Sequence, residues 1–152
     1  MAAEYLANAA QTVPFNAPAI FTASIPCTKG YVYHEDETGV FILRGIVNCP
    51  QSCYAVYRVT FNGNIALPDT ATDVIPIAMA LTVNGEPRLT SKAIYTPAAV
   101  DEFGNITSTA IIKTPRGCCL TLSVENIAAD PEQTDTPAII LQNANIVIDR
   151  IA

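Results

Sequence analysis

The fold is decided by the stretch Ile75-Pro76-Ile77-Ala78-Met79-Ala80-Leu81-Thr82-Val83-Asn84-Gly85. Large apolar side chains stand at every odd position from 75 to 83, and small or polar ones at every even position. A repeat of two residues is typical of a β-strand with one buried face. The Asn84-Gly85 pair that follows is the strongest short signal for a hairpin, because both residues tolerate a positive φ. The stretch therefore predicts an antiparallel hairpin.

The same alternation recurs along the chain. In residues 54–61 the side chains of Ala55, Tyr57, Val59 and Phe61 share one face, and a turn is expected at residues 62–64. Further strands are predicted at residues 13–15, 20–25, 31–33, 40–47, 91–96, 105–113, 118–125 and 139–151. The 11 prolines suit turns and edge strands and would break long helices. About ten strands at this spacing predict an all-β antiparallel sandwich or barrel.

The length of 152 residues fits one domain. Residues 12–152 are predicted to form that domain. Residues 1–11 are predicted to be an N-terminal arm, in which residues 2–10 would be helical or mobile.

Charge is sparse in this sequence and is not clustered. Only 14% of the residues are charged, against roughly 25% in an average soluble domain. The net charge is −6 and no two basic residues are adjacent, which argues against nucleic-acid partners and against an anionic membrane surface. We find neither a secretory signal at the start nor an apolar run of about 20 residues that would span a membrane. We expect a soluble protein made in a cytoplasm.

Two stretches carry bulky side chains on both faces, namely residues 54–59 and 144–148. A sandwich needs only one apolar face per strand, so the second face predicts contact with a sister subunit. The residues predicted at this subunit interface are Tyr54, Val56, Arg58 and Val147. The opposite phase, with Ala55, Tyr57, Val59 and Phe61 at the interface, stays open, because periodicity marks two faces without naming them.

The search for chemistry yields few groups. The sequence has one histidine and five cysteines, so at least one thiol is free or joins another subunit. Metal ligands are offered by Cys27, His34, Cys49 and Cys53, with a disulfide or unrelated, buried thiols as alternatives. Cys119 is a candidate for an intersubunit disulfide. No nucleotide, hydrolase or zinc-protease motif is present, and nothing places His34 beside a cysteine. We expect neither an enzyme nor a bound cofactor.

Several segments together resemble a known bacterial domain. They are Thr-Val-Pro-Phe at 12–15, Gly-Val-Phe-Ile-Leu-Arg-Gly at 39–45, the strands at 54–61 and 77–85, the Gly-Cys-Cys-Leu-Thr-Leu run within 115–126, and the terminal strand at 141–152. This order resembles the tumour-necrosis-factor-like, or complement-globular-head-like, jelly roll at the end of collagen-like exosporium proteins. The resemblance implies a ten-strand jelly roll that trimerises about a threefold axis. The collagen-like Gly-X-Y repeat of those proteins is missing from this sequence.

The opening residues, 1–13, resemble small proteins encoded beside capsid genes in phages and prophages of gut bacteria. That resemblance implies a capsid decoration or head-fibre protein on the virion exterior, made in the bacterial host cytoplasm, with the major capsid protein as partner. The arm residues expected to contact the capsid are Glu4, Tyr5, Leu6 and Gln11.

Two other functions stay open. One is a spore-coat or cell-surface domain for trimerisation or adhesion, at a bacterial surface. The other is a glycan-binding module for host surface glycans, with Tyr31, Tyr33, Tyr95 or Phe103 stacking on sugars.

Overall fold

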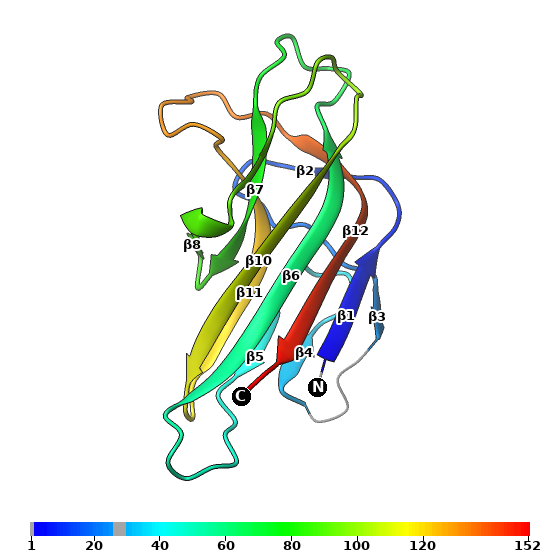
Figure 1. The fold of residues 1–152 in the computed structure, drawn as a ribbon. Coiled ribbons are helices and arrows are strands. Elements are labelled where there is room, and N and C mark those ends of the chain that lie inside the picture. Colours follow the sequence, from blue (N-terminus) through cyan, green and yellow to red (C-terminus); the bar gives the residue numbers. More distant parts are fainter. Residues whose placement is uncertain (1, 26–29) are drawn as a thin grey trace.

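The computed structural model describes residues 2–25 and 30–152, and nearly all of its regular structure is β (Figure 1). The strands are β1 (Ala2–Ala7), β2 (Gln11–Val13), β3 (Ala23–Ile25), β4 (Val32–His34), β5 (Phe41–Arg44), β6 (Tyr54–Ala66), β7 (Ile77–Val83), β8 (Glu86–Pro87), β9 (Ala93–Tyr95), β10 (Gly104–Pro115), β11 (Cys119–Ile127) and β12 (Ile139–Arg150). A single turn of 3-10 helix, η1 (Leu89–Ser91), lies between β8 and β9. Within the described ranges, no helix is long and apolar enough to cross a membrane.

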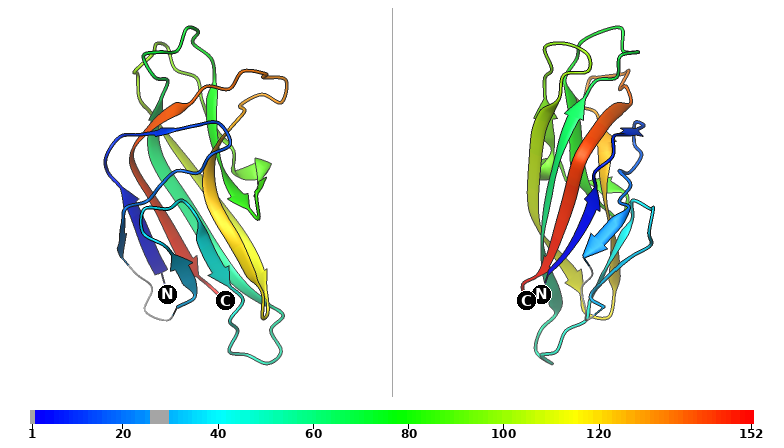
Figure 2. Two further views of the ribbon diagram at one scale, coloured as in Figure 1. Left: turned by 180° about the vertical axis from the view of Figure 1, so that it is seen from behind. Right: turned by 90° about the vertical axis from the view of Figure 1, so that its right-hand side faces the viewer.

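The strands form two antiparallel sheets. Sheet A has the order β10-β6-β12-β1-β3, and β2 also pairs with β12. Sheet B has the order β4-β5-β11-β7-β8, and β9 also pairs with β7. The two sheets face one another as layers (Figure 2), and the β10–β11 turn passes from one to the other. The prediction of an all-β antiparallel sandwich is confirmed.

One hydrophobic core fills the space between the sheets. Its fully buried large side chains are Phe21, Phe41, Leu43, Tyr57, Phe61, Ile65, Leu67, Ile77, Met79, Leu81, Ile112 and Leu122. Among the large apolar side chains at the odd positions of 75–83, Ile77, Met79 and Leu81 belong to this core. Both faces of β7 are buried, because Ala78 and Ala80 pack with Ile127 and Ala129 on the outer side of sheet B.

The hairpin predicted at Asn84-Gly85 is present between β7 and β8. The φ angles are 51° at Asn84 and 82° at Gly85, as the tight hairpin turn requires. The Asn84 side chain also accepts a hydrogen bond from the backbone N–H of Thr121 at 3.0 Å. The turn is thereby joined to the neighbouring strand β11.

The prediction of a helical or mobile arm at the N-terminus is wrong. Residues 2–7 form β1, which pairs with β12 on one side and with β3 on the other. Ala3, Tyr5 and Ala7 point into the core and are almost fully buried. Alanine is a good helix former and a poor strand former, so its local preference concealed a strand that tertiary packing stabilises.

The interpretation of residues 144–148 as apolar on both faces is only partly right. The pairing of β12 with β6 shifts between Gln142 and Asn145, and Asn143 has a φ of 53°, which marks a β-bulge. After the bulge Ala144, Ile146 and Ile148 face the core, while Asn145 and Val147 face outward. Val147 is therefore the one apolar side chain of that stretch on the outer face.

Candidate assembly surface

The outer face of sheet A carries the residues predicted at the subunit interface. Tyr54, Val56 and Arg58 alternate along β6 with the buried residues 55, 57 and 59. Val147 lies on the same face of β12, and its Cα partner on β6 is Thr60. The structure thus brings the four predicted residues onto one surface, although it contains no second subunit that would test their role.

The opposite phase is excluded. Ala55, Tyr57 and Val59 are 0% exposed and Phe61 is 1% exposed, because all four pack against sheet B inside the core. These side chains are not available to another subunit.

An apolar patch occupies the part of this face nearest the termini. We define the face patch as Tyr54, Val56, Ile111 and Val147. Tyr54 and Ile111 are each 47% exposed. Lys113 extends its ammonium group over the Tyr54 ring, 6.0 Å from the ring centroid.

An ion pair crosses the middle of the outer face. Arg58 Nη2 lies 2.8 Å from Asp149 Oδ2, and these two residues are direct partners across β6 and β12. The Arg58 side chain is largely exposed. A subunit that packed on the face patch would cover this pair with both charges already matched.

A cluster of amides and hydroxyls covers the other end of the outer face. The Asn105 side-chain N–H group donates to Asn62 Oδ1 at 3.0 Å and to Asn64 Oδ1 at 3.1 Å. Thr107 donates to Asn62 Oδ1 at 3.0 Å, and on the far side Asn145 donates to Glu4 at 2.9 Å. Because these groups already satisfy one another, covering them costs less than covering unpaired polar groups.

A second apolar surface adjoins the outer face of sheet A, along the free edge of β10. We define the edge patch as Leu89 and Ile94, which are 70% and 52% exposed. They belong to η1 and β9, and both elements lie beside β10. Arg88 donates to the backbone oxygen of Ile111 at 3.1 Å, so an arginine side chain occupies one acceptor of β10. Ser108, a buried side chain of β10, donates to the Ser91 oxygen at 2.6 Å and ties η1 to β10. Protected in this way, the edge favours side-chain contacts over strand addition.

Four cysteines lie at the end of the sandwich near the termini, and the expectation that they are buried is wrong. Cys49, Cys53, Cys118 and Cys119 are free and exposed. Backbone hydrogen bonds hold their segments together, from Arg116 N to the Cys53 oxygen at 2.9 Å and from Gly45 N to the Cys118 oxygen at 2.8 Å. Cys49 and Cys53 lie in the loop before β6, Cys118 lies in the β10–β11 turn, and Cys119 is the first, exposed residue of β11.

The residues offered as metal ligands do not form a site in the described chain. Residues 2–25 and 30–152 contain no group of three or more His, Cys, Asp or Glu side chains placed to hold an ion. His34 instead stacks on Phe41 at 4.4 Å, and its Nε2 lies 2.9 Å from the Thr38 oxygen. Cys27 lies outside the described residues.

The four residues expected to contact a capsid do not form a projecting arm. Tyr5 is buried against Phe41, with the ring centroids 4.7 Å apart. Gln11 exchanges two hydrogen bonds with the backbone of Ile20. Only Glu4 and Leu6 turn their side chains to the outer face of sheet A.

Two of the four aromatic residues offered for sugar stacking make other contacts. Arg150 lies over the Tyr31 ring at 4.6 Å, and the Tyr95 hydroxyl donates to the Glu102 oxygen at 3.3 Å. None of Tyr31, Tyr33, Tyr95 and Phe103 is among the residues that line the two cavities described below.

Comparison with known proteins supports the fold. No family model and no curated protein matches the sequence. Among solved structures, the globular domain of zebrafish complement 1qA protein matches with a TM-score of 0.65 and 12% identity, over 99% of this chain and 97% of that chain. Eiger TNF from S. frugiperda matches with a TM-score of 0.66 and 18% identity, over 100% and 92%. Murine APRIL matches with a TM-score of 0.58 and 8% identity, over 99% and 98%. The chain has the jelly-roll fold of these domains.

Proposed function

We propose that this chain is a non-enzymatic module that assembles into a homotrimer and works by surface display. The observation that carries the proposal is a pair of unlike apolar patches on one subunit, the face patch and the edge patch, which meet at β10. Exposed apolar patches on a soluble domain commonly mark interaction sites.

The arrangement of the patches favours a ring. If the face patch of one subunit packed on the face patch of a second subunit, the contact would have two-fold symmetry and the edge patch would remain exposed to water. A contact between the face patch of one subunit and the edge patch of the next is head-to-tail, and such contacts close into rings when the rotation allows it. The resemblance of the sequence to trimerising jelly rolls supports three as the number of subunits.

The chemistry of the outer face fits burial in such an assembly. The face patch supplies apolar area, the Arg58–Asp149 pair is already matched, and the amide cluster is hydrogen-bonded internally. A core of apolar residues with a satisfied polar surround is the usual composition of a protein interface.

The finer part of the proposal is a place on a virion. We propose that the trimer decorates a phage capsid, and this rests on the likeness of residues 1–13 to proteins encoded beside capsid genes. Contact with the major capsid protein is proposed for Leu6 only, since Tyr5 and Gln11 are occupied within the domain and Glu4 lies beside Val147 of the face patch. The alternatives are display on a spore or a bacterial cell.

The assembly is tested by sedimentation velocity with the Val147→Asp variant. The wild-type chain should sediment as a trimer at micromolar concentration. The variant should sediment as a monomer, because a new carboxylate on the face patch would have to be buried without a partner.

The matched control is Ile42→Asp. Ile42 is a half-buried β-branched residue on the outer face of sheet B, where no subunit contact is proposed. This variant should remain a trimer. A monomeric wild-type protein, or loss of the trimer in both variants to the same degree, would contradict the proposed interface.

The place of display is tested by immunogold labelling of material from a host that carries the gene. Gold particles on the exterior of phage capsids would support the virion proposal. If gold particles labelled spores or cell surfaces and left the capsids unlabelled, the virion proposal would be refuted and the trimer proposal would be unaffected.

A further inference from the structure

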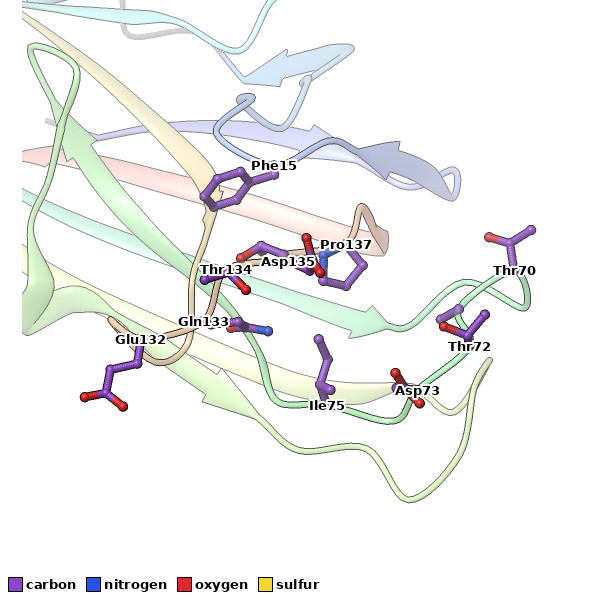
Figure 3. Close-up of a pocket in the computed structure, with 12 residues that line it drawn as sticks. Phe15, Thr70, Thr72, Asp73, Ile75, Glu132, Gln133, Thr134, Asp135 and Pro137 are labelled. Atoms are coloured by element: carbon purple, nitrogen blue, oxygen red, sulfur yellow. The ribbon is translucent and has the colours of Figure 1, made fainter.

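A cavity of about 680 Å³ opens at the end of the sandwich remote from the two termini (Figure 3). It lies between the loop that precedes β7 and the loop that follows β11, with Phe15 at its rim. Its volume falls within the range of roughly 300–1,000 Å³ that is usual for ligand pockets. None of its lining residues belongs to the face patch or to the edge patch.

The walls of this cavity are held in place by buried hydrogen bonds. Asn126 is fully buried on β11 and donates from its side chain to the oxygens of Pro137, at 2.9 Å, and Val13, at 3.1 Å. Its own backbone oxygen accepts from Asn16 N at 2.8 Å, beside Phe15. Gln133 accepts from the backbone N–H of Ala129 at 3.2 Å, which closes the loop after β11. A site formed before its ligand arrives loses less entropy on binding.

One side of the cavity is an exposed aromatic ring. Phe15 is 44% exposed, and Figure 3 shows its ring projecting over the segment that carries Thr134 and Asp135. Ile75 points in from the opposite loop. The cavity therefore offers a flat apolar surface that faces polar groups.

The polar groups of the lining are hydrogen-bonding oxygens and an amide. They include the carboxylates of Asp73 and Asp135, the hydroxyl of Thr134 and the side-chain amide of Gln133. No Lys, Arg or His is among the described residues that line the cavity, so its potential repels phosphates, sialic acids and other anions. The described residues also assemble no metal-binding group. The oxygens of Asp73, Asp135 and Thr134 accept hydrogen bonds, and together with the Phe15 ring they suit a ligand that combines an apolar face with several hydroxyl groups.

We propose that this cavity binds a neutral oligosaccharide. The apolar face of a sugar ring would stack on Phe15, and its hydroxyl groups would donate to Asp73 and Asp135. Hydrogen bonds from hydroxyl groups to carboxylates are short and strong, and they give orientation as well as affinity.

The occupant is a chain of sugars, not a single unit. A second hollow of about 240 Å³ shares Ile75, Glu132 and Gln133 with the first and continues to Asp130. The two hollows therefore lie next to each other along the loop after β11. Two neighbouring hollows suit a ligand with repeating units.

The test uses defined probes and amide chemical shifts. The isotope-labelled protein is titrated with neutral trisaccharides of glucose, galactose, mannose and N-acetylglucosamine. Sialyllactose serves as an anionic probe and trilysine as a cationic one. At least one neutral trisaccharide should shift the amides of residues 70–75 and 132–137 at or below about 10 mM, a concentration that suits a weak single site.

Two variants test the proposed contacts. Phe15→Ala should weaken binding about tenfold or more, because the stacking surface is lost. Asp135→Asn changes an exposed side chain with little risk to folding, and it should weaken binding by several-fold. Phe103→Ala is the matched control, because Phe103 is 41% exposed and lies outside the cavity, and it should bind like the wild-type chain.

Three results would overturn the proposal. They are no shift of these loops with any neutral trisaccharide at about 10 mM, binding of only sialyllactose or trilysine there, and unchanged binding in both Phe15→Ala and Asp135→Asn. The outcome is independent of assembly, since the Val147→Asp variant should keep the sugar site whether or not the wild-type chain is a trimer.

Discussion

The two faces of β6 differ sharply in their exposure to water. The inward side chains of residues 55–61 are at most 1% exposed and pack against sheet B. The outward side chains of the same strand include an exposed tyrosine, an exposed arginine and a threonine. A step of one residue along the chain thus separates the core from a surface.

This difference shows that the two faces of the strand have different roles, one in folding and one in surface contacts. The inward face supplies folding free energy, because its side chains leave water completely when the sheets meet. The outward face contributes little to folding, since its polar groups exchange water for weak surface contacts. Its side chains can therefore be selected for contact with a partner, as in the proposed trimer.

The largest change in the free energy of unfolding is expected for Phe61→Ala on the inward face. Removal of a buried ring leaves a cavity and should lower the unfolding free energy by about 3–5 kcal/mol. Urea denaturation at one fixed protomer concentration measures it. The outward neighbour Thr60→Ala should change the same quantity by less than about 1 kcal/mol. Equal losses in the two variants would contradict the division between the faces.

A smaller effect is expected from Tyr57→Phe, which keeps the ring and removes only the hydroxyl. That hydroxyl lies 2.5 Å from the Arg44 oxygen and 3.0 Å from the Tyr31 oxygen. Its loss leaves carbonyl groups without this donor and should cost about 1–3 kcal/mol in unfolding free energy. Calorimetry of the two proteins side by side is the measurement. A stability equal to that of the wild type would show that water replaces the hydroxyl.

On the outward face, Asn105→Ala removes the donor at the centre of the amide cluster. Its side chain bonds both Asn62 and Asn64, but all three groups are accessible to water. The expected cost is about 0.5–1.5 kcal/mol, measured by urea denaturation. A loss above that of Phe61→Ala would mean that the cluster belongs to the folding core.

The smallest effect is expected for Arg58→Ala. An exposed ion pair contributes about 0–1 kcal/mol, and salt weakens it further. Thermal unfolding at low and high salt should show a small difference between the variant and the wild type, which shrinks as salt rises. A difference that grows with salt would indicate a packing role for the arginine stem.

Much of this fold follows from local patterns. The alternation at residues 54–61 separated the two faces of that strand correctly without saying which one meets the core, and Asn84-Gly85 marked a hairpin whose φ angles match. Other features escaped the same reasoning. β1 was concealed by alanines, and the bulge at Asn143 reversed the phase of β12 in the middle of a strand. The run Gln142-Asn143-Ala144-Asn145 inside an otherwise apolar strand was the available signal for that bulge, because asparagine tolerates a positive φ.

The candidate sugar site was beyond prediction for another reason. Phe15, Asp73 and Asp135 are far apart in the sequence, and none belongs to a ligand-binding motif. They meet because β2 and β11 end, and β7 begins, at the same region of the sandwich, which is a matter of long-range strand pairing. The aromatic residues that looked suitable in the sequence lie elsewhere.

The sequence by itself determined that this protein is built of β-strands, where most of them lie and which residues share a face. A period of two is a property of neighbouring residues, so it can be read locally. Only the tertiary structure decided which face meets the core, that β1 joins sheet A, and which loops gather around Phe15. Those outcomes depend on pairings between distant strands, which form only when the two sheets close over a common core.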